Sequence, residues 1–257
     1  MTTMKGKRVL VTAGAGGIGR AIACAFASAG AVVFVCDIDE AALGQLREQL
    51  PSVMTSVCDI ADRGSVARMV AESAAALGGL DVLVNNAGIA GPSASVADMD
   101  PDAWETVVRV NLTGTFMVTQ LAIPHLKKST AGSIVVMSSL AGRFGYPNRS
   151  AYATTKWGLI GFTKTLSREL GEFGIRVNAI MPGAVAGSRL QQVFQGRASV
   201  SGHSVSQEEA AALANQSIKS FVDPADIAAL AVFLASDAGR SISGQMIPID
   251  GDSQSAS

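Results

Sequence analysis

The stretch RVLVTAGAGGIG, residues 8–19, decides the fold of this chain. The run from Arg8 to Val11 predicts a strand, and a helix is expected from Gly17 to Ala29. Between them, glycines recur with the spacing Gly-x-Gly-x-x-Gly from Gly14 to Gly19. Glycines permit a tight turn and close approach of the backbone to a pyrophosphate, and the helix that follows offers free N–H groups. A glycine string alone also suits an ordinary flexible turn, but the flanking strand and helix favour a dinucleotide-binding loop.

Short apolar runs alternate with longer amphipathic runs along the whole chain. This alternation indicates βαβ units and a parallel sheet with both faces covered. We therefore expect one α/β domain over residues 1–257, a Rossmann-type doubly wound parallel sheet of about seven strands with helices on both faces. The expected strands are residues 8–11, 32–36, 53–57, 82–85, 133–137, 176–180 and 245–249, and the expected helices are residues 17–29, 41–50, 64–77, 103–126, 152–171 and 224–235. Ligands in such folds bind beyond the carboxyl ends of the strands.

Residues 184–222 break this alternation. They contain no clear strand, are rich in Ser, Gly and Gln, and hold one helical patch at about 207–218. Because the segment leaves a strand on the ligand side of the sheet, we expect a substrate lid, with a passive surface excursion as the alternative. His203 within this segment is expected to be exposed to solvent rather than catalytic.

Charge and hydropathy exclude two classes of protein. The formal net charge of the 257 residues is −1, and no run of five like charges occurs, so a nucleic-acid-binding protein is not expected. The longest uncharged stretch, residues 21–36, is split by Gly30 and fits a helix followed by a strand better than a membrane span. Residues 1–10 show no signal-peptide pattern, so we expect a cytoplasmic protein.

The chain has three cysteines, Cys24, Cys36 and Cys58. Their number is odd and their spacing matches no ligand motif, which argues against a disulfide framework and against a zinc site. Since free cysteine packs as a small apolar residue, we expect core thiols and no bound metal.

An acidic residue ends the second expected strand. Asp37 lies 18 residues beyond Gly19. A carboxylate there accepts hydrogen bonds from the adenosine ribose hydroxyls and repels a 2′-phosphate. No Lys or Arg lies within residues 13–19 or directly beside Asp37. The pattern predicts NAD rather than NADP; the alternative role for Asp37 is a cap of the helix that follows.

Tyr152 and Lys156 mark the candidate catalytic helix. They are four residues apart in a helical stretch and so share one face. A free tyrosine titrates near pH ~10, and a neighbouring ammonium favours the phenolate, so such a pair suits acid–base chemistry. Taken alone, this spacing also occurs on ordinary amphipathic helices.

Polar residues near other strand ends strengthen this interpretation. Ser138 and Ser139 end the fifth strand, where a hydroxyl hydrogen-bonds a substrate oxygen and stabilises its developing charge. The run Asn85-Asn86-Ala87-Gly88 ends the fourth strand. Asn111 lies inside an expected helix, where an amide side chain is unfavourable. Beside a Tyr/Lys pair, Asn111 would anchor a water that relays protons.

With these motifs in this order, the chain resembles the short-chain dehydrogenase/reductases, the single-domain group of about 250 residues. The similarity spans about Gly6 to Gly251 and includes the 13-residue spacing from Ser139 to Tyr152. The resemblance implies that Tyr152 is the acid/base, Ser139 orients the substrate oxygen, Lys156 binds the nicotinamide ribose and tunes Tyr152, and Asn111 holds the relay water. The cofactor contacts it implies are Gly14, Gly17, Ile18, Gly19, Asp37, Ile38, Asp59, Ile60, Asn86, Ala87, Gly88, Tyr152, Lys156, Pro182, Gly183 and Val185.

Enzymes of this family are commonly tetramers that pair their long helices. The resemblance therefore implies a homotetramer or homodimer with residues 103–126 and 152–171 at the interface. The chain departs from the family pattern at two places. Ala13 replaces the usual first loop glycine, which the loop tolerates if the φ of Ala13 is negative. Gly187 and Ser188 stand where a threonine often bonds the nicotinamide amide, and Ser188 is the expected substitute.

Four arginines fall where the substrate approaches in this family: Arg143, Arg149, Arg189 and Arg197. Arginine holds a carboxylate, sulfonate or phosphate through paired hydrogen bonds. We therefore hypothesise a polar, anionic hydroxy or keto substrate. Ion pairs on the surface or between subunits are the alternative for these side chains.

The leading interpretation is an NAD-dependent oxidoreductase that transfers a hydride between the cofactor and a secondary alcohol or ketone. One alternative is an NADPH-dependent ketone reductase of the 3-oxoacyl reductase type, which Asp37 disfavours. Another is a non-catalytic NAD-binding redox sensor. A sensor would be expected to lose Ser139, Tyr152 or Lys156, and the chain keeps all three.

Overall fold

Seven parallel strands form one sheet in the computed structural model, which describes residues 3–256. They are β1 (Arg8–Thr12), β2 (Val32–Asp37), β3 (Met54–Val57), β4 (Val82–Asn85), β5 (Ser133–Met137), β6 (Arg176–Pro182) and β7 (Met246–Ile249). Their order across the sheet is β3-β2-β1-β4-β5-β6-β7, so the direction of winding reverses between β1 and β4. The expected doubly wound sheet is confirmed, and the reversal opens a crevice for ligands beyond the carboxyl ends of β1 and β4.

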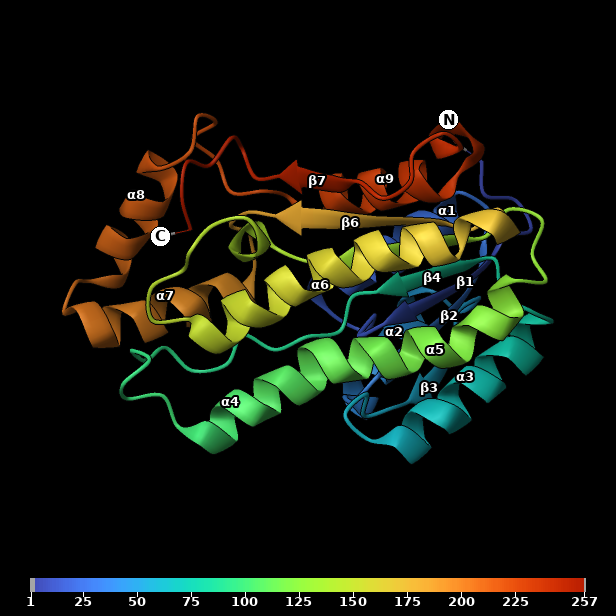
Figure 1. Ribbon diagram of the computed structural model, residues 1–257, viewed down its shortest axis with the longest axis horizontal. Coiled ribbons are helices and arrows are strands. Elements are labelled where there is room, and N and C mark those ends of the chain that lie inside the picture. Colours follow the sequence, from blue (N-terminus) through green and yellow to red (C-terminus); the bar gives the residue numbers. More distant parts are fainter. Residues whose placement is uncertain (1–2, 257) are drawn as a thin grey trace.

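Helices cover both faces of this sheet (Figure 1). Successive residues of a strand point to opposite faces, and β1 shows this clearly. Val9 and Val11 belong to a core under α1 (Gly17–Ser28), α2 (Glu40–Gln49) and α9 (Pro224–Ala235). Leu10 belongs to the core on the other face, under α3 (Arg63–Leu77), α5 (Thr115–Leu126) and α6 (Ser150–Glu169). A strand buried on both faces requires the continuous apolar run that the sequence shows.

The helix expected over residues 103–126 is interrupted. It consists of α4 (Pro101–Val108), a π-helical turn (Arg109–Gly114) and α5. A Cβ on Gly114 would lie 2.8 Å from the carbonyl oxygen of Ile60, so only glycine allows the turn to approach the loop after β3 this closely. The turn contains the fully buried Asn111, whose amide bonds to Ile89 and Thr155, and π-helical turns occur often at functional sites.

The candidate lid is more ordered than the single helical patch that we expected. It forms two helices, α7 (Ser188–Ser201) and α8 (Val205–Ala214). A capping box begins α8, because Ser204 accepts from the backbone of Gln207 and Gln207 accepts from that of Ser204. Figure 1 shows both helices at the end of the molecule toward which the arrows of β6 and β7 point. As expected, the His203 side chain is 64% exposed, and it contacts Glu208.

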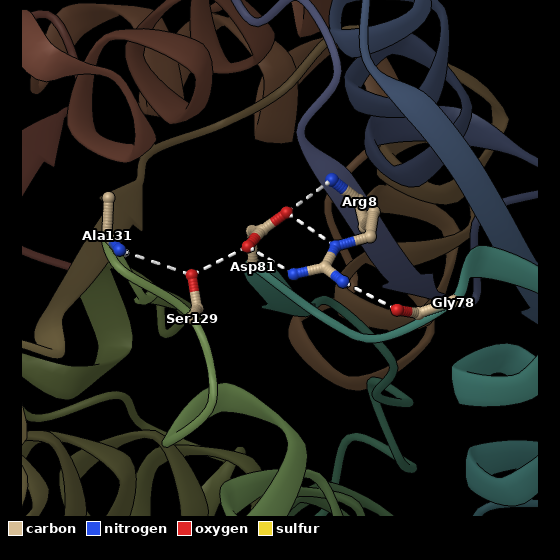
Figure 2. A network of polar contacts seen from close by, with 5 residues as sticks. All are labelled: Arg8, Gly78, Asp81, Ser129 and Ala131. Atoms are coloured by element: carbon tan, nitrogen blue, oxygen red, sulfur yellow. Dashed lines mark hydrogen bonds and ion pairs between the residues drawn. The ribbon is translucent and has the colours of Figure 1, made fainter.

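A polar network holds the opposite end of the sheet (Figure 2). Arg8 at the start of β1 donates from Nε and Nη2 to the two carboxylate oxygens of Asp81, each at 2.8 Å. Ser129 donates to the same carboxylate at 2.6 Å, and Arg8 also donates to the carbonyl of Gly78. Burial by itself raises the pKa of Asp81, but the hydrogen bonds from Arg8 and Ser129 outweigh it and lower that pKa to about 2.

All three cysteines are free thiols, as predicted, and two of the three are buried. Cys36 and Cys58 are buried core thiols, whereas Cys24 is half-buried on α1. Within residues 3–256, no helix has the length and apolar character that a bilayer span requires.

Candidate active site

One cavity of about 410 Å³ opens beyond the carboxyl ends of the strands. Its walls come from the glycine loop, the ends of β2, β4, β5 and β6, the start of α6 and the lid. The predicted site residues that line it are Gly17, Ile18, Gly19, Asp37, Asn86, Gly88, Ser139, Arg149, Tyr152, Lys156, Pro182, Gly183, Val185 and Arg189. The fold thus gathers residues that lie up to 172 positions apart in the sequence (Gly17 to Arg189).

Several predicted cofactor residues lie outside the cavity lining: Gly14, Ile38, Asp59, Ile60 and Ala87. Gly14 packs beneath the loop, where a Cβ would lie 2.8 Å from Val35. Ala87 is buried and donates its N–H to Thr12. Asp59 receives the N–H of Ala61. Gly14 and Ala87 therefore support the loop, and direct contacts of Ile38, Asp59 and Ile60 with the cofactor remain predictions.

Close packing against β4 fixes the shape of the glycine loop. The Asn86 side-chain amide donates to the carbonyls of Thr12 and Ala13, at 3.1 and 3.0 Å. A Cβ on Gly19 would lie 2.1 Å from the Ala13 oxygen and 2.5 Å from Asn86, so glycine is required there. Around Gly16 and Gly17, by contrast, no atom of residues 3–256 beyond the adjoining backbone would lie within 4 Å of an added Cβ. This open cradle before the N-terminus of α1 fits a pyrophosphate group.

The φ angle of Ala13 is +49°, contrary to the negative value on which the tolerance of alanine depended. Alanine therefore occupies the left-handed region that usually selects glycine, at a cost of about 1–2 kcal/mol. The Asn86 amide donates to the Ala13 carbonyl and so helps to hold the loop in this form. The prediction of a negative φ at Ala13 is therefore wrong, although the loop forms as predicted.

Asp37 faces the cavity at the end of β2. Its carboxylate accepts hydrogen bonds from the backbone N–H groups of Ala15, at 3.0 Å, and Asp39, at 3.2 Å. The cap of α2 is Asp39, which accepts from Ala42, so the alternative role of Asp37 as that cap is wrong. An anionic oxygen beside the glycine loop is the group that a free ribose diol would meet.

Tyr152 and Lys156 lie together on the first turns of α6. The Lys156 ammonium nitrogen is 5.5 Å from the centroid of the Tyr152 ring. The same nitrogen donates to the Met137 carbonyl at 2.8 Å. Burial, and to a smaller extent the positive charge of Arg189, lowers the pKa of Lys156 to about 7. Lys156 is thus a strongly desolvated donor between the end of β5 and the tyrosine ring.

The two serines at the end of β5 have different roles. Ser138 is buried and donates to the Lys156 carbonyl at 2.9 Å, which binds α6 to the strand. Ser139 is half-buried, and its oxygen accepts the N–H of Ala141 at 3.1 Å. Within residues 3–256 the Ser139 hydroxyl donates no hydrogen bond, so its proton is available to an oxygen in the cavity.

Asn111 clamps the segment after β4. Its amide accepts from the Ile89 N–H at 2.7 Å and donates to the Ile89 carbonyl at 3.0 Å, and it also donates to Thr155 on α6. A Cβ on Gly88 would lie 3.1 Å from the Asn111 oxygen and 3.6 Å from the Lys156 ammonium. Asn111 does not line the cavity, and its role in holding a relay water remains a prediction.

Three of the four arginines line the cavity, and we call Arg149, Arg189 and Arg197 the arginine cluster. Arg149 is 3% exposed and donates from Nη2 to the Ala90 carbonyl at 3.0 Å. Its guanidinium carbon lies 5.4 Å from the ring centroids of both Tyr146 and Tyr152. Its Nε is buried and meets no hydrogen-bond acceptor within residues 3–256.

The electrostatics of this cluster favour an anion. Burial lowers the pKa of Arg149, and the charges of Arg197 and Arg189 act in the same direction, against the opposing effect of Tyr146 and Tyr152. Arginine nevertheless stays protonated in proteins, so the cluster concentrates positive charge, which Glu208 offsets in part near Arg197. Arg197 donates to the Tyr146 hydroxyl, which fixes part of this wall.

Arg143 does not line the cavity, contrary to expectation. Its guanidinium lies 4.0 Å from the Asp250 carboxylate and stacks on the Phe144 ring at 5.0 Å. Residues 143–149, between a short 3-10 helix (Leu140–Gly142) and α6, form a loop whose path the sequence does not specify. That loop turns Arg143 away from the cavity and turns Arg149, at the start of α6, toward it.

Some residues that line the cavity were not predicted from the sequence. They are Tyr146, Asn215 and Gln216, and, near the C-terminus, Ser253, Ser255 and Ala256. The expected substitute Ser188 does line the cavity, just after Gly187 with its φ of +140°. Tyr146 could have been suspected as one of two tyrosines close to the catalytic helix. The residues after β7 carry no sequence motif. They lie beside the segment after α8 only because of tertiary packing.

The comparisons agree with this architecture. A family model described as enoyl-(acyl carrier protein) reductase matches residues 13–251. The 3-oxoacyl-[acyl-carrier-protein] reductase of Thermotoga maritima is 37% identical over 252 residues, with 96% of this chain and 98% of the relative covered. The chain belongs to the short-chain dehydrogenase/reductase family of oxidoreductases.

Two solved structures show what similar folds bind. The crystal structure of an NAD⁺-bound xylitol dehydrogenase has a TM-score of 0.92 and 30% identity, covering 96% of this chain and 98% of that one. An actinorhodin polyketide ketoreductase variant with NADPH has a TM-score of 0.90 and 31% identity, covering 98% of both chains. Both forms of the nicotinamide cofactor therefore occur among the structural relatives of this chain.

Proposed function

We propose that this protein is an NAD-dependent oxidoreductase that acts on a secondary alcohol or the corresponding ketone and prefers polar, anionic substrates. The observation that carries this proposal is a single cavity. Tyr152, Lys156 and Ser139 line it together with the glycine loop and Asp37, although these groups come from four separate parts of the sequence. Acid–base groups and a dinucleotide cradle that share one cavity fit hydride transfer.

The residues present fit a nicotinamide dinucleotide. The open cradle at Gly16 and Gly17 would hold the pyrophosphate, Asp37 the adenosine ribose, and Lys156 the nicotinamide ribose. Pro182, Gly183 and Val185 at the end of β6 would line the nicotinamide side. When bound, the nicotinamide ring supplies the hydride acceptor or donor.

The chain's own groups supply proton transfer and orientation. Tyr152 takes the hydroxyl proton as the alcohol is oxidised, and returns a proton to the oxygen in the reverse direction. Ser139 donates to the same oxygen and offsets its developing negative charge. The Arg149 guanidinium carbon and the Lys156 ammonium nitrogen lie 5.4 and 5.5 Å from the centroid of the Tyr152 ring, so both groups stand next to the proposed acid/base.

Three features distinguish this proposal from its alternatives. The carboxylate of Asp37 would repel the 2′-phosphate of NADP, which disfavours a reductase of the NADPH-dependent 3-oxoacyl type. The arginine cluster fits a substrate carboxylate, sulfonate or phosphate. A non-catalytic redox sensor would have no use for the available proton of Ser139 in the cavity that Tyr152 also lines.

We also infer a homo-oligomer, homotetramer or homodimer, that pairs α5 and α6. Phe116 on α5 and Trp157 on α6 are 44% and 50% exposed, and Phe116 packs edge-on against Phe162. Large apolar side chains exposed on neighbouring helices fit a buried contact between subunits. Light scattering of the purified protein tests this inference, and a monomer at micromolar concentration contradicts it.

The deciding experiment is a screen of hydroxy acids, sugar acids and polyols with NAD or NADP, followed by absorbance of the reduced cofactor. We expect turnover with NAD, and its loss in Tyr152→Phe while NAD binding stays within about threefold of the wild type. Turnover that survives in Tyr152→Phe would remove the proposed acid/base. A clear preference for NADP would instead favour the 3-oxoacyl reductase alternative.

A further inference from the structure

The lid and the C-terminal segment are joined into one wall of the cavity. Residues 215–218, after α8, run antiparallel to residues 251–255, with a bridge between Gln216 and Ser253. Backbone hydrogen bonds link Ser217 to Asp252, Ile218 to Gly251 and Gln254 to Asn215. The Asn215 amide also donates to the Ser255 carbonyl at 2.6 Å. We call the residues of this wall that face the cavity the lid–tail wall: Ala212, Asn215, Gln216, Ser253, Ser255 and Ala256.

Gln216 carries an unused hydrogen-bond acceptor into this wall. The residue is 3% exposed, and its amide nitrogen donates to the Ala212 carbonyl at 3.3 Å. Its amide oxygen is buried and receives no hydrogen bond within residues 3–256. The oxygen packs closely against Gly251, which has a φ of +64° and where a Cβ would lie 2.8 Å from it. A buried acceptor without a donor costs about 1–3 kcal/mol, so a ligand that donates to it gains affinity.

Ser253 adds a second acceptor to the same wall. Its hydroxyl is buried and donates to the Asp250 carbonyl at 2.7 Å, so the oxygen retains lone pairs but no free proton. Gln216 and Ser253 both line the cavity, and each has an oxygen to which no group within residues 3–256 donates. Such acceptors are satisfied by a hydrogen-bond donor such as a hydroxyl, and a carboxylate or a ketone cannot donate.

We propose that the lid–tail wall is a subsite for the hydroxyl groups of a polyhydroxylated carboxylic acid. This inference rests on the proposed function and deepens it, because the arginine cluster lines the same cavity and takes the acid group. One wall offers concentrated positive charge, and the other offers neutral acceptors. A ligand that satisfies both carries an anionic group and several hydroxyls, as acids of the sugar-acid class do.

The subsite is tested by comparing the affinities of two six-carbon carboxylates, one with hydroxyl groups and one without. Binding of D-gluconate and of hexanoate to the NADH complex is measured by titration calorimetry, which does not require turnover. We expect the wild type to bind D-gluconate more tightly. Gln216→Leu should weaken D-gluconate binding about tenfold and leave hexanoate binding unchanged. Ser253→Ala, a smaller change, should also weaken the binding of D-gluconate.

A matched control is Gln192→Leu, the same substitution at an exposed lid residue outside the cavity, which should alter neither affinity. Thermal unfolding and NADH binding verify that each variant is folded. The proposal is overturned if the wild type does not prefer D-gluconate, if Gln216→Leu weakens both acids equally, or if it weakens NADH binding instead. Because turnover of any secondary alcohol is scored separately, loss of the subsite is distinguishable from failure of the proposed function.

Discussion

The Lys156 ammonium donates to the main-chain carbonyl of Met137, with nitrogen and oxygen 2.8 Å apart. This bond ties α6 to the end of β5 and holds the ammonium 5.5 Å from the centre of the Tyr152 ring. The side chain is 4% exposed, so the site keeps a cation where solvent hardly reaches. Holding it there is expected to reduce the stability of the fold.

Replacement of Lys156 by methionine should therefore stabilise the protein without cofactor at low pH. The pKa of Lys156 falls from 10.5 to about 7, so the unfolded chain binds this proton more tightly than the folded one. The free energy of unfolding of the wild type therefore decreases by up to roughly 5 kcal/mol as pH falls from about 10.5 to 7. Below pH 7, Lys156 causes no further change. The gain in Lys156→Met should be a few kcal/mol at pH 6 and absent at pH 10.5. Urea unfolding at both values measures it, and a difference independent of pH would contradict the argument.

Asp37→Ser should relax the cofactor preference. Loss of the carboxylate removes its repulsion of a 2′-phosphate and its hydrogen bonds to the adenosine ribose. We expect the ratio of kcat/KM for NADP to that for NAD to rise at least about tenfold. Asp39→Ser is the matched control, because Asp39 caps α2 and lies outside the cavity. An equal change in both variants would assign the effect to local structure.

Arg149→Met should separate anionic from neutral substrates. A charge-assisted hydrogen bond contributes about 1.5–3 kcal/mol, so kcat/KM for a hydroxy acid should fall roughly 10- to 100-fold. For a neutral secondary alcohol we expect a change of less than about threefold. Arg143→Met, outside the cavity, should leave the ratio of the two substrates unchanged. Equal losses for both substrates in Arg149→Met would exclude a direct contact with the acid group.

Ala13→Gly should stabilise the fold. The φ of +49° at this residue is strained for alanine and relaxed for glycine. The expected gain is about 1 kcal/mol, or roughly 2–4 °C in Tm for a chain of this size. Ala15→Gly, in the same loop but at a residue without positive φ, should instead lower Tm. Calorimetry of both variants decides the matter, and a lower Tm for Ala13→Gly would refute the strain.

Asp81→Asn should remove a pH-dependent part of the stability. The folded pKa of Asp81, about 2, lies below the usual 3.8, so its contribution is complete above about pH 5 and is lost as pH falls toward 2. The shift corresponds to about 2 kcal/mol at neutral pH. In urea unfolding, Asp81→Asn should therefore be less stable than the wild type at pH 7, and this difference in the free energy of unfolding should shrink toward pH 2. Since Asp81 lies at the end of the sheet away from the cavity, KM should not change.

Much of the site followed from the sequence because its residues sit at predictable places. The glycine loop, Asp37 and Ser139 each follow a strand, and the carboxyl ends of parallel strands meet at one edge. The spacing of Tyr152 and Lys156 fixes their shared helical face. Loops lack such a rule, which explains why Arg143 and Arg149 could not be told apart.

The sequence by itself therefore determined the alternation of strands and helices, the doubly wound sheet and the helix that carries Tyr152 and Lys156, since hydrophobic periodicity and glycine spacing are local properties of the chain. Only the tertiary structure decided which arginines enter the cavity, that Ala13 is strained, and that residues 251–256 return to pair with the lid. These outcomes depend on contacts between residues that are distant in sequence. No local pattern encodes such contacts, because they arise from how the finished elements pack together.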